Sequence, residues 1–149
     1  MGKLGTTSRA RLNTCHSDLI EITELAIKRS RIDFGISEGM RSIERQKELF
    51  TQGKTKIDGV NEKGKHNYSP SLALDFYAYH PDDEIRSKIA YDKPTLAYIA
   101  AIFICCAQEL FEAGEITHLV RWGGNWDKDG VILLDQSFDD MPHIELFKP

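Results

Sequence analysis

The sequence is poor in cysteine and has no excess of basic residues, and both shortages exclude functions. Three cysteines occur in 149 residues, namely Cys15, Cys105 and Cys106. Their number is odd and two are adjacent, so the pattern excludes a spaced disulfide framework and a C-x-x-C metal site. We expect all three to be small core residues in a reducing compartment. The net charge of −4 gives no electrostatic case for binding nucleic acid or an acidic membrane surface.

Long apolar runs are also missing. Residues 1–10 are polar and lack the apolar stretch of a signal peptide. The longest apolar stretch, residues 96–107, is shorter than the roughly 20 residues that cross a bilayer. We therefore expect no membrane insertion and a protein that is made and held in the cytoplasm. No repeat or Pro/Gly/Ser linker divides the chain, whose length fits one domain.

The spacing of apolar residues predicts helices and short strands. Helices are expected over residues 12–30, 41–52 and 94–113, the second opened by Ser42 as an N-cap. Strands are expected at residues 33–37, 72–79, 119–122 and 143–147, a turn at 80–83, and loops at 55–68 and 123–130. Because helices come first and the strands show no regular βαβ alternation, the order favours an α+β domain with a small antiparallel sheet.

Asp75 lies in the middle of the apolar strand at residues 72–79. A buried carboxylate is costly unless it is paired or binds a metal, so an arginine partner and a metal site are the two interpretations. His66, nine positions earlier, and His143 add two imidazoles. Two histidines and one aspartate, with a fourth position left for water, are the ligand set of a catalytic zinc. Each histidine by itself also suits a surface or core position.

Two further residues suit catalysis beside a metal. Asp140, three positions before His143 and across Pro142, could act as a general base. Asp139 is the adjacent alternative, and two solvated loop acids are a third interpretation. Arg41 lies between a predicted strand and a predicted helix, where it could hold a carboxylate or a carbonyl oxygen. An exposed surface arginine is the alternative.

Three segments, taken in order, resemble the M15 family of zinc peptidases. SEGMRSIERQKELF resembles the family's S-x-G-x-R-S-x-x-x-Q, KHNYSPSLALDFYAY its S-x-H-x-x-G-x-A-x-D, and DDMPHIEL its acid-x-x-H-x-E/Q. The family includes D-Ala-D-Ala carboxypeptidases and the L-alanyl-D-glutamate peptidases of phage endolysins. The chain departs from the pattern in two places: Gly64 replaces a serine, and nine steps instead of seven separate His66 from Asp75.

The resemblance implies a role for each candidate residue. It assigns one Zn²⁺ to three ligands, His66, Asp75 and His143. Asp140 is then the general base, and Arg41 stabilises the scissile carbonyl or binds a substrate carboxylate. Ser37, in the first segment, is expected to contact substrate. Trp122 is expected to line the cleft as well, although a core position suits it equally.

The resemblance also implies a fold and a reaction. We expect a single peptidase domain over residues 1–149, of the hedgehog/D-Ala-D-Ala-peptidase-like fold, without a separate wall-binding module. The expected reaction is hydrolysis of L-alanyl-D-glutamate bonds in peptidoglycan stem peptides by a monomeric endolysin. A D-Ala-D-Ala carboxypeptidase and a non-catalytic wall-peptide-binding module are the alternatives. A holin-like membrane partner is expected to release the protein from the host cytoplasm. His16, His80 and His118 show no partner pattern and are expected to be structural or surface residues.

Overall fold

The computed structural model describes residues 2–55, 57–61, 63–123 and 141–149. In these residues the α-helices are α1 (Thr6–Leu12), α2 (Ser17–Arg29), α3 (Ile43–Thr51), α4 (Asp83–Ile89) and α5 (Lys93–Glu112). The strands are β1 (Phe34–Glu38), β2 (Ala73–Ala78), β3 (Leu119–Trp122) and β4 (His143–Phe147), and a short 3-10 helix, η1, spans Lys65–Asn67.

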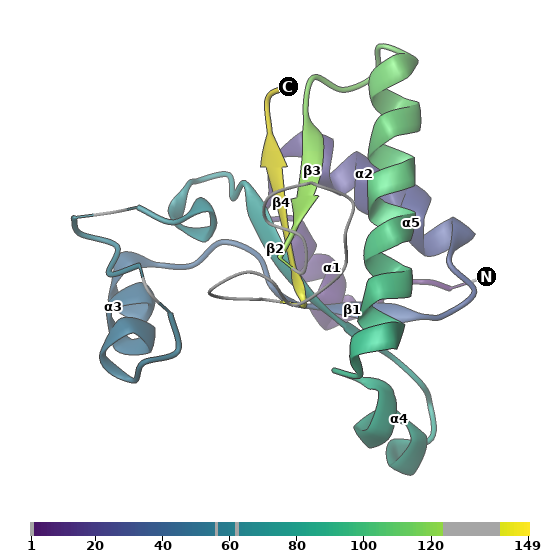
Figure 1. Ribbon diagram of the computed structural model, residues 1–149, viewed down its shortest axis with the longest axis horizontal. Helices are drawn as coiled ribbons and strands as arrows, with labels where there is room; N and C mark the ends of the chain where they lie inside the picture. Colours follow the sequence, from purple (N-terminus) through teal and green to yellow (C-terminus); the bar gives the residue numbers. More distant parts are fainter. Residues whose placement is uncertain (1, 56, 62, 124–140) are drawn as a thin grey trace.

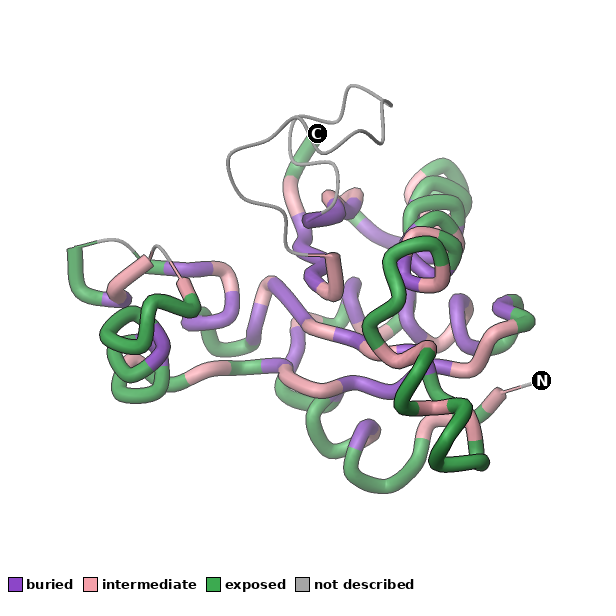
Figure 2. The backbone as a smooth tube through the Cα atoms, turned by 60° about the horizontal axis from the view of Figure 1, so that its bottom comes forward, coloured by how far each residue is buried: buried purple, intermediate pink, exposed green. Residues whose placement is uncertain are grey.

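The described strands form one sheet in the order β1-β2-β4-β3, and every neighbouring pair is antiparallel. The α+β fold with an antiparallel sheet is therefore confirmed. Helices α2 and α5 lie together to one side of the sheet (Figure 1). Helices α3 and η1 lie to the other side, away from α2 and α5 (Figure 1). Phe34, Phe76 and Phe103, from β1, β2 and α5, pack with ring centroids 5.2–6.4 Å apart. Buried segments run along the strands and outer turns are exposed (Figure 2).

The single helix predicted over residues 12–30 is wrong, because α1 and α2 are separated by residues 13–16. These residues contact a segment that is distant in the sequence. The His16 N–H donates to the carbonyl of Ser71 at 2.8 Å, and the Ser71 N–H donates to the carbonyl of Thr14 at 2.9 Å. His16 Nδ1 then accepts the N–H of Asp18 and caps α2. Long-range contacts thus override the local helical pattern.

Two short helices were not expected. Helix α4 begins at the end of the turn predicted over residues 80–83, where the Asp82 carboxylate accepts the N–H of Ile85 at 2.9 Å. Helix η1 lies inside the loop predicted over residues 55–68. The predicted strands at residues 119–122 and 143–147 are confirmed. Of the loop predicted over residues 123–130, only Gly123 lies within the described residues.

Helix α5 is long and apolar enough, by length and composition alone, to cross a membrane. Core helices of globular proteins meet the same criterion. Here one side of α5 is buried, through Leu96, Ile99, Ala100, Phe103, Cys106 and Ala107. Cys15 and Cys106 are buried as predicted, but the prediction is wrong for Cys105, which is exposed on the outer side of α5.

Candidate metal centre

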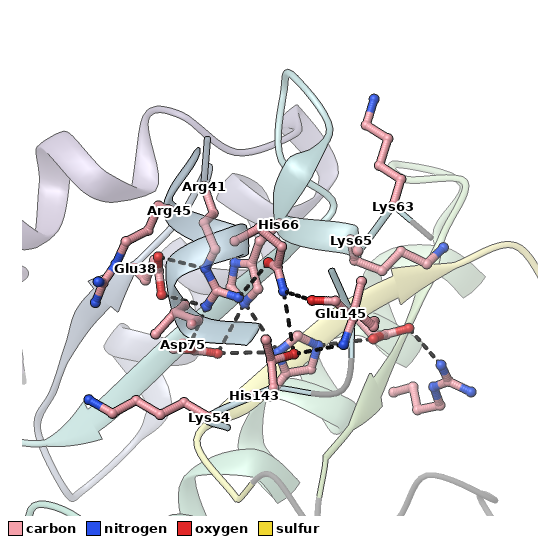
Figure 3. A pocket seen from close by; sticks show the side chains of 16 residues that line it. Glu38, Arg41, Arg45, Lys54, Lys63, Lys65, His66, Asp75, His143 and Glu145 are labelled. Carbon is pink, nitrogen blue, oxygen red and sulfur yellow. Dashed lines mark hydrogen bonds and ion pairs between the residues drawn. The ribbon is translucent and has the colours of Figure 1, made fainter. Parts of the chain in front are cut away.

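Three side chains from different elements meet at one end of the sheet: His66 of η1, Asp75 of β2 and His143 of β4 (Figure 3). Asp75 and His143 are direct partners in the antiparallel β2–β4 pairing, so their side chains project from the same face. His66 Nε2, Asp75 Oδ1 and His143 Nδ1 each lie 3.2 Å from the other two. These residues form a group that could hold a metal ion.

The loop that is longer than the family pattern still brings His66 to the other two residues. Backbone hydrogen bonds hold both ends of this loop in place. The Leu72 N–H donates to the carbonyl of Lys65 at 3.1 Å, and Ser71 bonds the segment between α1 and α2. The carbonyl of His66 accepts the N–H of Arg41 at 2.6 Å. The two additional residues between His66 and Asp75 therefore lengthen the loop without moving His66 away from the other two side chains.

The remaining ring nitrogens determine which atoms face the centre. His66 Nδ1 lies 2.7 Å from the carbonyl oxygen of Gly39. His143 Nε2 lies 2.9 Å from Oε1 of Glu145. Both partners accept hydrogen bonds, so these outward nitrogens carry protons, and the two inward nitrogens are the ones that can present lone pairs to a bound cation. Two lone pairs and a carboxylate that converge at 3.2 Å are a favourable arrangement when a cation lies between them.

Asp75 is ionised in this environment. Burial opposes ionisation, but interactions with His143 and His66 outweigh it and hold the pKa of the Asp75 carboxyl well below its usual range. Arg41 adds a positive charge, with Nη2 3.7 Å from Asp75 Oδ2. An ionised carboxylate beside neutral imidazoles is the state required of a metal ligand.

Arg41 lies beside the three residues, and its side chain is held by two others. Its Nε and Nη2 donate to the two carboxylate oxygens of Glu38 at 2.8 and 2.6 Å. Its Nη1 donates to Oε1 of Gln46 at 2.9 Å. A guanidinium that is held from two sides keeps one orientation beside the centre. A cavity of about 480 Å³ adjoins Arg41 and the three residues of the centre.

Known proteins resemble this chain in sequence and in fold. Residues 1–147 match the family described as phage L-alanyl-D-glutamate peptidase. The chain belongs to this family. The peptidoglycan L-alanyl-D-glutamate endopeptidase CwlK of Bacillus subtilis (strain 168) is 30% identical over 122 residues, which cover 77% of this chain and 61% of CwlK. The crystal structure of the Serratia marcescens L-Ala D-Glu endopeptidase ChiX is similar, with a TM-score of 0.72, 25% identity, and coverage of 97% of this chain and 90% of ChiX.

Two of the other predicted site residues of this phage peptidase family member lie away from the cavity, and one is outside the described residues. Asp140, with its alternative Asp139, lies outside the described residues. Ser37 is absent from the described lining of the cavity. Trp122 lies in the core instead of the cleft: it is 2% exposed, and its Nε1 donates to the carbonyl of Met141 at 2.6 Å. Alternation along β3 points Trp122 to the core and its neighbour Arg121 to the cavity.

Two residues at the site were not identified from the sequence of this family member. Glu145 is buried and accepts hydrogen bonds from His143 and from Arg121, the latter at 2.7 Å. Burial opposes its ionisation, but His143 and Arg121 outweigh burial and lower the pKa of the Glu145 carboxyl. Gly39 is the other: a Cβ there would lie 2.4 Å from the carbonyl oxygen of Arg11. The H-x-E spacing in β4 and the glycine of SEGMRS were the available signals.

A second His/Asp/His group lies away from this centre, at His16, Asp18 and His118. The sequence showed no partner pattern for His16 and His118, but both contact Asp18 in the structure. His118 Nδ1 lies 2.7 Å from Asp18 Oδ2, which also accepts the N–H of Thr117 at 3.0 Å. His16 Nδ1 accepts the N–H of Asp18 and lies 4.0 Å from Asp18 Oδ1. Because protein donors occupy these lone pairs, the group joins α2 to the segment before β3 as a structural contact.

Proposed function

We propose that this protein is a zinc-dependent endopeptidase that hydrolyses L-alanyl-D-glutamate bonds in peptidoglycan stem peptides. The observation that carries the proposal is the triangle of His66 Nε2, Asp75 Oδ1 and His143 Nδ1, with 3.2 Å sides. Ligand atoms about 2.0–2.1 Å from a tetrahedral zinc are about 3.3–3.4 Å apart. Two imidazoles and one carboxylate suit zinc, whereas Ca²⁺ and Mg²⁺ favour oxygen ligands throughout.

A bound zinc would supply Lewis acidity for activating water and polarising the scissile carbonyl. The chain's own groups supply the rest. Gly39 and Glu145 keep the two imidazoles in the tautomers that direct lone pairs inward. Arg41, held by Glu38, can donate hydrogen bonds to a developing oxyanion or to a substrate carboxylate.

Asp140 completes the proposed machinery as the general base. Its support is the acid-x-x-H pattern, in which the acid stands three residues before His143. A carboxylate in this role takes a proton from the attacking water and delivers it to the leaving amine. Retention of such an acid favours an enzyme over a binding module, because binding a stem peptide does not require a base.

The bond and the biological setting are part of the same proposal. The family is described as phage L-alanyl-D-glutamate peptidase, and both CwlK and ChiX are named for cleavage of that bond. The match spans 61% of the length of CwlK, so the activity is extended from CwlK to this chain by inference. We also propose that it acts as a monomeric endolysin, released from the host cytoplasm with a holin-like partner.

The test is digestion of purified peptidoglycan, followed by mass spectrometry of the products. We expect new N-terminal D-glutamate, loss of activity with a chelator and recovery with added Zn²⁺. His143→Ala should be inactive, while His80→Ala, outside the centre, serves as the control and should stay active. Release of free D-Ala would reassign the enzyme as a carboxypeptidase. Full activity of His143→Ala would overturn the zinc centre.

A further inference from the structure

The charge around the cavity is opposite to the charge of the whole protein. The chain carries a net charge of −4. Among the described residues that line the cavity, six are arginine or lysine and three are aspartate or glutamate. A positive concave surface on an acidic protein concentrates anions at that surface. The positive residues of the cavity therefore indicate that the site binds an anion, and solubility alone does not explain their position.

The acids of the cavity are already partnered, so they do not neutralise all of its cations. Glu38 binds Arg41, and Glu145 binds Arg121 and His143. Asp75 faces the two histidines of the centre. These contacts involve only the two arginines at the base of the site. The cavity's other cations remain to be explained.

Of the four other cations, Arg45 pairs with Glu48 at 3.2 Å, and the remaining three are lysines: Lys54, Lys63 and Lys65, which we refer to as the lysine rim. Among the residues that the structure describes, no carboxylate lies within ion-pair distance of any of them. Lys63 Nζ lies 4.3 Å from the ring centroid of Tyr68, a contact that orients it without neutralising it. In Figure 3 the three amino groups extend away from the metal centre, with Lys54 on one side of it and Lys63 and Lys65 on the other.

The backbone holds the lysine rim close to the chemistry. Lys65 directly precedes His66, whose carbonyl accepts the N–H of Arg41. Asn67 bonds the same turn, accepting from the Gly64 N–H at 2.9 Å and donating to the Arg41 carbonyl at 3.0 Å. The segment that supplies a proposed metal ligand therefore also places two rim lysines.

We propose that the lysine rim binds the free carboxylate of the D-glutamate next to the scissile bond, and that it selects stem peptides in which this group is not amidated. The inference rests on the proposed function. One carboxyl group of D-glutamate continues the peptide, and the other is an anion unless it is converted to the amide. Lysine ammonium groups attract such an anion as flexible point charges, and they lose this attraction when the partner is neutral.

The test compares three synthetic tripeptides that begin with L-Ala-D-Glu. The first has all carboxylates free, the second carries a carboxamide in place of the free carboxylate of D-glutamate, and the third carries a carboxamide on its third residue. The rim variant combines Lys54→Gln, Lys63→Gln and Lys65→Gln. The control variant combines three exposed lysines outside the cavity lining, Lys28→Gln, Lys47→Gln and Lys88→Gln. Each variant lowers the net charge by the same three units.

We expect the wild type and the control to cleave the first and third peptides with kcat/KM about tenfold above the second, mainly through KM. In the rim variant this advantage should disappear, because cleavage of the first and third peptides falls while that of the second is unchanged. Higher ionic strength should reduce the wild-type advantage in the same way.

Several outcomes would overturn the inference. Equal cleavage of the first two peptides by the wild type would do so, and so would an equal loss on both in the rim variant. A penalty confined to the third peptide would exclude D-glutamate as the contact. If no protein cleaves any peptide while all bind Zn²⁺, the proposed peptidase function fails, and the inference fails with it.

Discussion

Replacing Glu145 by glutamine tests how the chain prepares the metal centre. The carboxylate is 5% exposed, with Oε1 2.9 Å from His143 Nε2 and Oε2 2.7 Å from Arg121 Nη2. Glutamine has nearly the same size and can still accept from the imidazole, but it carries no charge. Partners that orient metal-binding histidines are worth about 10–100-fold in metal affinity. We therefore expect Glu145→Gln to weaken Zn²⁺ binding by about 1.4–2.7 kcal/mol.

The assay is competition for Zn²⁺ with a chromophoric chelator, which gives the apparent Kd. Thermal unfolding with a chelator present measures the metal-free fold separately. Glu109→Gln is the matched control, because Glu109 also pairs with an arginine, Arg29, but on an exposed surface away from the centre. Its Zn²⁺ affinity should equal that of the wild type.

A folded Glu145→Gln protein with wild-type Zn²⁺ affinity would refute the reasoning. It would mean that the negative charge of Glu145 does not strengthen His143 as a metal ligand. A large loss of metal-free stability without a change in affinity would instead assign Glu145 a purely structural role beside Arg121.

Three further predictions concern single positions. Gly39→Ala places a Cβ 2.4 Å from a backbone carbonyl and should lower the unfolding free energy by about 1–3 kcal/mol in urea titration, whereas Gly5→Ala, with open space around it, should not. Cys105 should react rapidly with a thiol reagent in the native protein, whereas burial raises the pKa of Cys15 to about 11 and should leave it unreactive; equal rates would contradict this. Burial opposes ionisation of Asp18, but hydrogen bonds from His118 and Thr117 outweigh it and lower its pKa. Its stabilisation is therefore complete above about pH 4 and is lost as the pH falls through the lower folded pKa. Asp18→Asn should cost about 1–2 kcal/mol at pH 7 in urea titration, and this difference should narrow in acid; a constant difference would contradict the assignment.

Local signals accounted for much of the secondary structure. Ser42 accepts the N–H of Arg45 and begins α3 as predicted. Gly114, with φ of 75°, follows the end of α5, where a left-handed residue is favourable. These features depend on residues within one turn of each other. The break between α1 and α2 could not be predicted in the same way, because it depends on pairing with Ser71, more than fifty positions away.

The sequence by itself determined which residues could serve the centre. An aspartate in an apolar strand needs a partner and imidazoles are good ligands, and the resemblance of three ordered segments to a zinc-peptidase family assigns these roles to His66, Asp75 and His143. The position of Arg41 in the SEGMRS segment, between a predicted strand and a predicted helix, indicated its role. These are properties of residue type and order, which the chain carries before it folds.

Only the tertiary structure decided how those residues are arranged. The β2–β4 register brings Asp75 and His143 together, and contacts with Gly39 and Glu145 determine which ring nitrogens face inward. It also placed Trp122 in the core and gathered the lysine rim around the cavity. The physical reason is that register, tautomer and local charge depend on groups far apart in sequence, whose distances are fixed only when the sheet and its loops pack.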